Sequence, residues 1–223
     1  MATRKSADTI FVKTFGGLTV YQHNVPKFVK WQSNKARLLF CYLITYYNQW
    51  VHRDRLIAML WPDGDPVSNE NNFRTTLKRL RIALEGFRIN PVMRMGDAYR
   101  LNFEAISCDF AMFREEATTG IKLQVQGDIQ GALAHLVYAE ELCAAEFLPE
   151  EPSDPLIQEL RQQVGKLQVM VLNSLKSFSP ENKYHDLPVV MSLHQGKIPE
   201  SFAVQPRGRS RAGTIRRAAR VGS

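Results

Sequence analysis

The chain has 223 residues, of which 44% are hydrophobic and 10% aromatic, and these proportions exclude a wholly disordered protein. Its net charge of +7 divides into +8 over residues 1–104, −6 over residues 105–177 and +5 over residues 178–223. We therefore expect a basic first module with a polyanionic partner and an acidic second module with a protein partner.

Short β-rich runs open the chain. Ile10 to Val12 and Leu18 to Tyr21 flank Phe15-Gly16-Gly17, whose glycines permit a tight turn. The segment from Lys27 to Trp31 is a candidate third strand. These runs predict a small antiparallel sheet at the start of the first module.

Two helices are predicted next. Ser33 is placed to cap a helix that runs through Asn48, where apolar residues recur at helical spacing. Asp54 is placed to cap a second helix over Arg55 to Leu60. The segment from Trp61 to Pro66 then stops this helix and forms a rigid loop.

A third helix, Asn69 to Leu84, has two unlike faces and a candidate N-cap at Ser68. One face is a narrow apolar stripe, formed by Phe73, Leu77, Leu80 and Leu84. The other face is rich in Arg and Lys beside Asn and Thr, a pattern typical of a surface that meets a polyanion. A solvated surface helix that is merely basic is the alternative interpretation.

A β-hairpin follows this helix. Gly96-Asp97 supplies a two-residue turn between Pro91 to Met95 and Ala98 to Asn102. The order of sheet, helix, helix, loop, basic helix and hairpin predicts a winged helix. In that fold the last helix enters the major groove and the hairpin reaches the backbone or the minor groove.

The acidic second module is predicted to consist of three helices, over Phe110 to Thr119, Asp128 to Glu146 and Asp154 to Leu175. Gly120 and Gln126-Gly127-Asp128 are the expected turns. Helix pairs joined by such turns are typical of a tetratricopeptide (TPR)-like array, although three helices are too few to verify a repeat. The basic tail from residue 178 onwards shows no period and is predicted to be disordered.

Several short motifs follow one another between about residue 10 and residue 177, and their order and spacing together are specific. They are Phe15-Gly16-Gly17-Leu18, Lys35-Ala36-Arg37-Leu38-Leu39, Arg53-Asp54-Arg55-Leu56-Ile57, Leu60-Trp61-Pro62-Asp63, Asn71-Asn72-Phe73-Arg74-Thr75-Thr76-Leu77, Leu80-Arg81, Tyr99-Arg100-Leu101, Asp109 with Phe113, and Phe147-Leu148-Pro149. In these motifs the chain resembles bacterial activators of the Streptomyces antibiotic regulatory protein (SARP) type. Those proteins join an OmpR-type winged helix to a bacterial transcriptional activator domain (BTAD).

The resemblance implies a mostly α fold with small β elements, organised as a winged-helix DNA-binding domain over residues 9–104, a partial TPR-like BTAD over 105–177 and a basic tail over 178–223. It implies a cytoplasmic, nucleoid-associated activator that binds direct repeats in double-stranded DNA and contacts RNA polymerase, with a homodimer on DNA left open. The implied polymerase contact is the loop formed by Asp63, Gly64, Asp65, Pro66 and Val67. Further helices after Leu175 are implied too, and residues 178–223 do not supply their pattern.

The DNA contacts follow from side-chain chemistry. Lys78 and Arg79 are the candidates for base edges, because both donate to guanine acceptors. Candidates for an adenine edge, a phosphate and a thymine methyl are, in that order, Asn71, Thr75 and Ile82. Candidates for phosphates are Arg74, Arg81, Arg94 and Arg100. The alternative for Arg74 and Arg81 is an ion pair within the helix, to Glu70 or Glu85.

No metal, cofactor or catalytic site is predicted. Asp63, Asp65 and Glu70 superficially suggest a calcium loop, but Pro66 and the missing glycine and glutamate positions argue against it. The sequence has none of the motifs GxxxxGK[ST], GxGxxG, GxSxG or HExxH. The Glu115-Glu116 and Glu140-Glu141 pairs are assigned to solvated helix faces, and an enzyme is not expected.

No membrane segment is expected, because the longest apolar run, Leu38 to Ile44, is far too short to span a bilayer. The chain has no CxxC pair, as expected for a reducing compartment. The alternative function from another class is a helical adaptor whose winged helix docks onto a protein, since fold alone does not exclude it.

Overall fold

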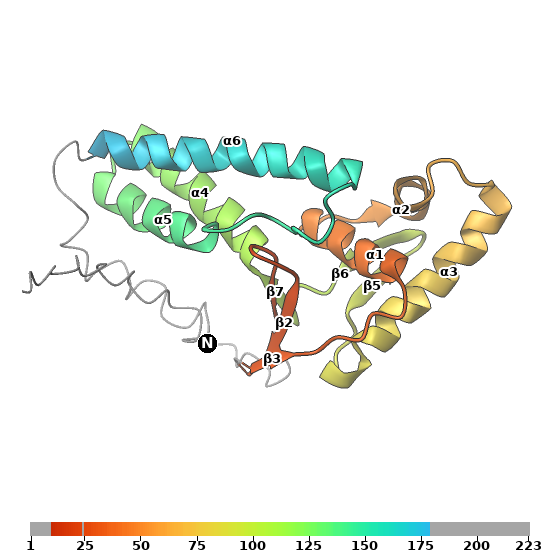
Figure 1. The fold of residues 1–223 in the computed structure, drawn as a ribbon. Coiled ribbons are helices and arrows are strands. Elements are labelled where there is room, and N and C mark those ends of the chain that lie inside the picture. Colours follow the sequence, from red (N-terminus) through yellow and green to blue (C-terminus); the bar gives the residue numbers. More distant parts are fainter. Residues whose placement is uncertain (1–9, 24, 179–223) are drawn as a thin grey trace, which may run out of the picture.

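The computed structural model describes residues 10–23 and 25–178, and Figure 1 shows a group of helices and small sheets with a further group of helices beside it. This part of the chain contains six α-helices, seven strands and one 3₁₀ turn, so the fold mixes mostly α structure with small sheets as predicted. The predicted tail lies outside the described residues, apart from Phe178, which ends the last helix.

The first sheet joins the start of the chain to a strand nearly one hundred residues later. Its strands, in the order in which they lie side by side, are β3 (Val25–Lys27), β2 (Thr19–Gln22), β1 (Ile10–Lys13) and β7 (Ile106–Cys108). The pair β1 and β2 is antiparallel as predicted, whereas β7 runs parallel to β1. The third strand shares only Lys27 with the predicted Lys27 to Trp31 segment and lies before the rest of it. Strand β7 was not predicted, because three residues show no period.

The winged helix has the predicted order. Its elements are α1 (Asn34–Thr45), β4 (Val51–His52), α2 (Arg53–Leu60), α3 (Pro66–Ala83), η1 (Glu85–Phe87), β5 (Val92–Met95) and β6 (Ala98–Leu101). The second sheet has the order β4-β6-β5, so the short strand β4 fastens the hairpin to the segment that leads into α2.

The structure corrects several helix boundaries. The hydroxyl of Ser33 caps α1 as predicted, accepting from the Ala36 amide at 3.1 Å, but the helix ends at Thr45 and not at Asn48. His52, not Asp54, is the N-cap of α2. Asp65 replaces Ser68 as the N-cap of α3: its carboxylate accepts from the Ser68 amide at 2.9 Å. Proline favours the first helical position, which explains the earlier start of α3.

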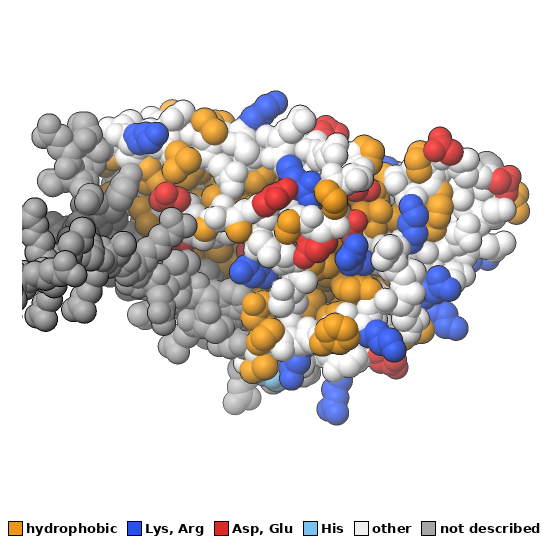
Figure 2. Space-filling view, viewed as in Figure 1, with side chains coloured by type: hydrophobic (Ala, Val, Ile, Leu, Met, Phe, Trp, Pro, Cys, Tyr) orange, Lys and Arg blue, Asp and Glu red, His pale blue; other side chains and the backbone are white. Residues whose placement is uncertain are grey.

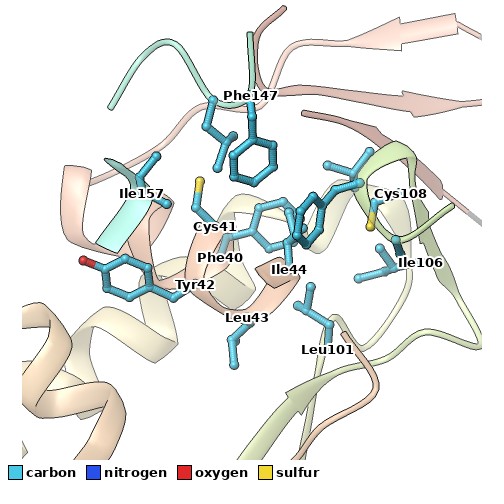
Figure 3. Packing of buried hydrophobic residues seen from close by; sticks show 14 of the residues in the cluster. Phe40, Cys41, Tyr42, Leu43, Ile44, Leu101, Ile106, Cys108, Phe147 and Ile157 are labelled. Atoms are coloured by element: carbon cyan, nitrogen blue, oxygen red, sulfur yellow. The ribbon is translucent and has the colours of Figure 1, made fainter. Parts of the chain in front are cut away.

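Helix α1 lies at the centre of the hydrophobic core. Every residue from Leu38 to Thr45 is buried, and Figure 3 shows α1 side chains between those of two different regions. On one side are Leu101, Ile106 and Cys108, and on the other is Phe147, which follows the fifth helix. A helix that is apolar on all sides must be covered on all sides. The winged helix and the helices that follow it therefore share one core.

Three helices, α4 (Asp109–Val125), α5 (Ile129–Leu142) and α6 (Pro155–Phe178), form what we call the helical module. Gly120 is not the predicted turn, because it lies buried inside α4 against Leu136 of α5. Glu116 is not on a solvated face either: it is 2% exposed, and its carboxylate lies 2.5 Å from Nδ1 of His135. A one-dimensional pattern does not show which face of a helix a neighbour will cover.

Loop backbone fastens the helical module to the first sheet. The Thr14 carbonyl accepts from the Leu148 amide at 2.9 Å, and the Gly16 amide donates to the Glu146 carbonyl at 2.7 Å. Strand β7 follows the predicted domain boundary at residue 104 and pairs with β1. The division into domains remains a prediction, and the two modules share their core across it.

Gly120→Ala is expected to lower the free energy of unfolding by about 1–3 kcal/mol, because an added Cβ would lie 2.6 Å from Cγ of Leu136. Gly165→Ala in α6 is the matched control. It meets no atom within 4 Å and should raise stability by about 0.5–1 kcal/mol. Urea unfolding measures both changes, and the same sign for both would contradict the close approach of α4 and α5.

Candidate nucleic-acid interface

Helix α3 presents the predicted polar face to solvent. Its stripe of Phe73, Leu77, Leu80 and Leu84 is buried to between 0% and 6% exposure. The seven candidate contact residues on this helix are all exposed, namely Asn71, Arg74, Thr75, Lys78, Arg79, Arg81 and Ile82. The packing of the apolar stripe against the core, including α1, thus fixes which side of α3 faces outward.

The cations of this face differ in their partners. Within the described residues, Lys78, Arg79 and Arg81 form no ion pair. Arg74 does, since its Nη2 lies 2.7 Å from Oε1 of Glu70 one turn earlier, the alternative that the spacing allowed. Three carboxylate-free cations close together favour an anionic partner.

Figure 2 shows Lys and Arg side chains along the side where Figure 1 draws α3, at the right of the view. Acidic side chains gather at the upper right, beside the start of this helix. Asp63 and Asp65, in the segment that leads into α3, are exposed. An acidic segment therefore directly precedes the helix that carries the basic face.

The hairpin β5-β6 is the wing. Its turn has Gly96 at φ +58°, a left-handed conformation suited to glycine. Tyr99 belongs to the core, with its ring edge-on to Phe73 at 5.3 Å between centroids. Because paired residues share a face and neighbours alternate, Arg94, opposite Tyr99, and Arg100 lie on opposite faces of the hairpin.

The two wing arginines have different surroundings. Arg94 is exposed, and its Nε donates to the Gly96 carbonyl at 2.7 Å. Arg100 is half-buried: its guanidinium lies 4.6 Å from the centroid of the Trp50 ring and donates to Oδ1 of Asn48 at 3.2 Å. Phosphate contact by both remains a prediction, and the geometry favours Arg94.

The predicted loop from Asp63 to Val67 is partly helical, because Pro66 and Val67 form the first turn of α3. Hydrogen bonding from the Ser68 backbone lowers the pKa of Asp65, in keeping with its role as a cap. Asn69, which was not among the predicted site residues, is 4% exposed and donates to the Trp61 carbonyl at 3.4 Å. It holds this loop against the end of α2.

Arg53, at the start of α2, also contributes to this site, a role that its place in the sequence motif did not indicate. Its guanidinium lies 3.4 Å from Glu70 of α3 and 3.6 Å from Asp97 of the wing turn. These partners are far from it in sequence, and no one-dimensional period connects them. Only the folded chain reveals this junction.

Within the described ranges, no three His, Cys, Asp or Glu side chains are placed to hold a metal ion together. In the same ranges, no helix combines the length and apolar character needed to cross a bilayer. The expectation that the protein is not an enzyme remains a prediction.

The chain is similar in sequence to a mycobacterial transcriptional regulator. The transcriptional regulatory protein EmbR of Mycobacterium tuberculosis is 30% identical over 105 residues, as is EmbR of Mycobacterium bovis. The match covers 46% of this chain and 27% of each relative, so it spans about a quarter of their length. No protein-family model matches the chain.

A solved structure of EmbR from Mycobacterium tuberculosis, in complex with a low-affinity phosphopeptide, superimposes with a TM-score of 0.62. The superposition covers 74% of this chain and 44% of that one, at 20% sequence identity. The two chains share a fold. The likeness to EmbR thus supports the arrangement of a winged helix followed by helices.

Proposed function

We propose that the chain is a sequence-specific regulator of transcription that binds double-stranded DNA by placing α3 in the major groove. The observation that carries the proposal is the exposed face of α3, where Lys78, Arg79 and Arg81 stand without carboxylate partners among the described residues. The similarity to EmbR, which is named a transcriptional regulatory protein, supports the same role.

In this proposal the exposed side chains of α3 make different contacts with the DNA. Arg79 donates two hydrogen bonds to a guanine edge, and Lys78 donates to the same kind of acceptor. Asn71 suits an adenine, Thr75 a phosphate, and Ile82, 39% exposed, a thymine methyl. These contacts select the sequence.

Phosphate contacts supply affinity without selecting a sequence. Arg81 on α3 and Arg94 on the wing are exposed and suited to them. Arg74 joins them by exchanging the Glu70 carboxylate for a phosphate, and Arg100 does so only by leaving Trp50 and Asn48. The wing thereby reaches the backbone beside the groove that α3 occupies.

The regulator acts as an activator of the SARP type in this proposal, binding direct repeats in the nucleoid and contacting RNA polymerase through residues 63–67. Two features support the contact. Asp63 and Asp65 are exposed, and Val67 is 74% exposed at the tip of α3. A homodimer on adjacent repeats and a BTAD-like role for the acidic helical module belong to the same proposal.

Selection of bound sequences from a random duplex library, with the full chain as bait, tests the proposal. We expect one enriched motif that recurs at a fixed spacing, bound with an affinity that falls linearly with salt on logarithmic axes. Binding without any enriched sequence would contradict specific reading. A stable protein partner together with absent DNA binding would instead favour the adaptor alternative.

A further inference from the structure

A chain of alternating charges connects the two elements that the proposed function places on DNA. We call it the charge chain; in spatial order its members are Arg74, Glu70, Arg53, Asp97 and Arg94. Its outer members, Arg74 and Arg94, lie on α3 and on the wing, and Arg53 of α2 occupies the middle.

We infer that Arg53 is a positioning residue that holds the wing turn at a fixed place relative to α3, and thereby supports the reading of DNA by both elements together. The inference rests on the proposed function for its DNA part. Its structural part, the placement of the wing, is independent of any ligand.

Arg53 contacts both α3 and the wing turn. Nη1 of Arg53 lies 3.4 Å from Oε1 of Glu70 and 3.6 Å from Oδ1 of Asp97, so one nitrogen bridges both elements. The Arg53 amide also donates to the Asp97 carbonyl at 2.7 Å, which extends the pairing of β4 with β6 to the turn. Backbone and side chain of one residue therefore hold the same turn.

The Arg53 guanidinium is surrounded by carboxylates. The Arg53 side chain is 27% exposed and also meets Asp54 at 3.2 Å, and these carboxylates raise the pKa of its guanidinium, with the Asp54 hydrogen bond as the largest cause. An isolated surface ion pair contributes little to stability, but a network that shares one guanidinium is the exception. A planar guanidinium suits such sharing better than an ammonium does.

The outer members of the charge chain, Arg74 and Arg94, are also proposed phosphate contacts. Arg74 lies 2.7 Å from Glu70, and Arg94 lies 3.5 Å from Asp97. When these two arginines turn to phosphates, Glu70 and Asp97 keep Arg53 as their partner and are not left without a cation. Arg53 thus holds the two elements together in the free and the bound protein.

The test uses the full chain with Arg53→Met, which keeps an unbranched apolar stem and leaves the backbone amide in place. Hydrogen exchange of the free protein is expected to speed up at the wing-turn amides of residues 96–98 and to stay unchanged in α6. Affinity for the selected DNA site is expected to fall roughly three- to tenfold, and hydroxyl-radical protection is expected to be lost on the wing side only.

Arg55→Met is the matched control. Arg55 lies on the same helix and carries the same charge, but its guanidinium stacks on Tyr46, and within the described ranges it forms no ion pair with the wing or α3. It should leave exchange at the wing turn unchanged. Arg53→Lys, which keeps the charge without the planar fork, should give an intermediate increase in exchange.

Asp97→Asn gives a second route if Arg53→Met does not fold. It is expected to reproduce the faster exchange, and combining it with Arg53→Lys should add little, because both changes weaken the same contact between Arg53 and Asp97. Wild-type exchange at the wing turn in Arg53→Met, or in Asp97→Asn, would overturn the positioning role.

Faster exchange with unchanged affinity and footprint would overturn the link to DNA reading. Absence of DNA binding by the wild-type chain would refute the proposed function. The exchange data would still decide whether Arg53 holds the wing.

Discussion

Replacing Lys78 and Arg79 together with alanine is expected to lower affinity for the selected DNA site by roughly 30- to 1,000-fold, or about 2–4 kcal/mol. Both side chains are exposed on α3 and have no carboxylate partner within the described residues, so their removal breaks no internal ion pair there. The folded state should be affected little. Gel-shift titration at fixed salt measures the loss, and thermal unfolding verifies the fold.

Two control variants distinguish a loss of base contacts from a loss of positive charge. Lys122→Ala with Lys166→Ala removes the same charge from exposed positions of α4 and α6, and should change affinity little. Arg81→Ala should weaken binding to all sequences alike and reduce the salt slope by about one. If the double change at Lys78 and Arg79 behaved like Arg81→Ala, with no loss of sequence preference, these residues would be phosphate contacts.

Asp109→Ala is expected to have a large effect on stability, lowering the free energy of unfolding by about 3–5 kcal/mol. The Asp109 carboxylate is 3% exposed and accepts from the amides of Thr14, Phe15 and Phe110 at 2.8–3.0 Å. It also accepts from the Thr14 hydroxyl at 2.6 Å. Alanine would leave these buried donors unsatisfied at the junction between β1 and α4, as urea unfolding would show.

Asp128→Ala is the matched control, because it makes the same substitution at an exposed N-cap. Asp128 accepts from the Gly131 amide at 3.0 Å, and loss of such a cap costs about 1 kcal/mol. Similar losses for the two variants would show that the buried carboxylate does not fasten β1 to the helical module.

Burial raises the pKa of Asp109, and this effect exceeds the lowering by its hydrogen bonds from Thr14, Phe15 and Phe110. The folded carboxyl then binds a proton at pH values where the unfolded one has lost it. Its contribution to stability is fully present below the unfolded pKa and falls as the pH rises through the folded pKa. The difference between wild type and Asp109→Ala is therefore expected to be larger near about pH 4 than near about pH 7.

The sequence predicted the winged helix well where the pattern is local. The stripe on α3 repeats at helical spacing, and Gly96-Asp97 can form a turn whatever surrounds it, so both were predicted correctly. The exposed side of α3 followed from the stripe alone. Roles on DNA for the residues of that side remain predictions.

The errors occurred where distant residues decide the outcome. Gly120 looked like a turn residue, but the close approach of α5 makes it a helix-packing position. Glu116 looked solvated until His135 and the neighbouring helix covered it. Strand β7 is too short to show a sequence pattern, and it is a strand because its backbone pairs with the edge of β1.

By itself, the sequence determined which helical faces are apolar, where the wing turns, and that an exposed basic face follows an acidic loop. These are local properties, set by side-chain periodicity and backbone preference. Only the tertiary structure decided that Arg53 joins the wing to α3, that Asp109 fastens the helices to the first sheet, and that one core serves both modules. Those contacts join residues far apart in the chain, and compact packing alone brings them together.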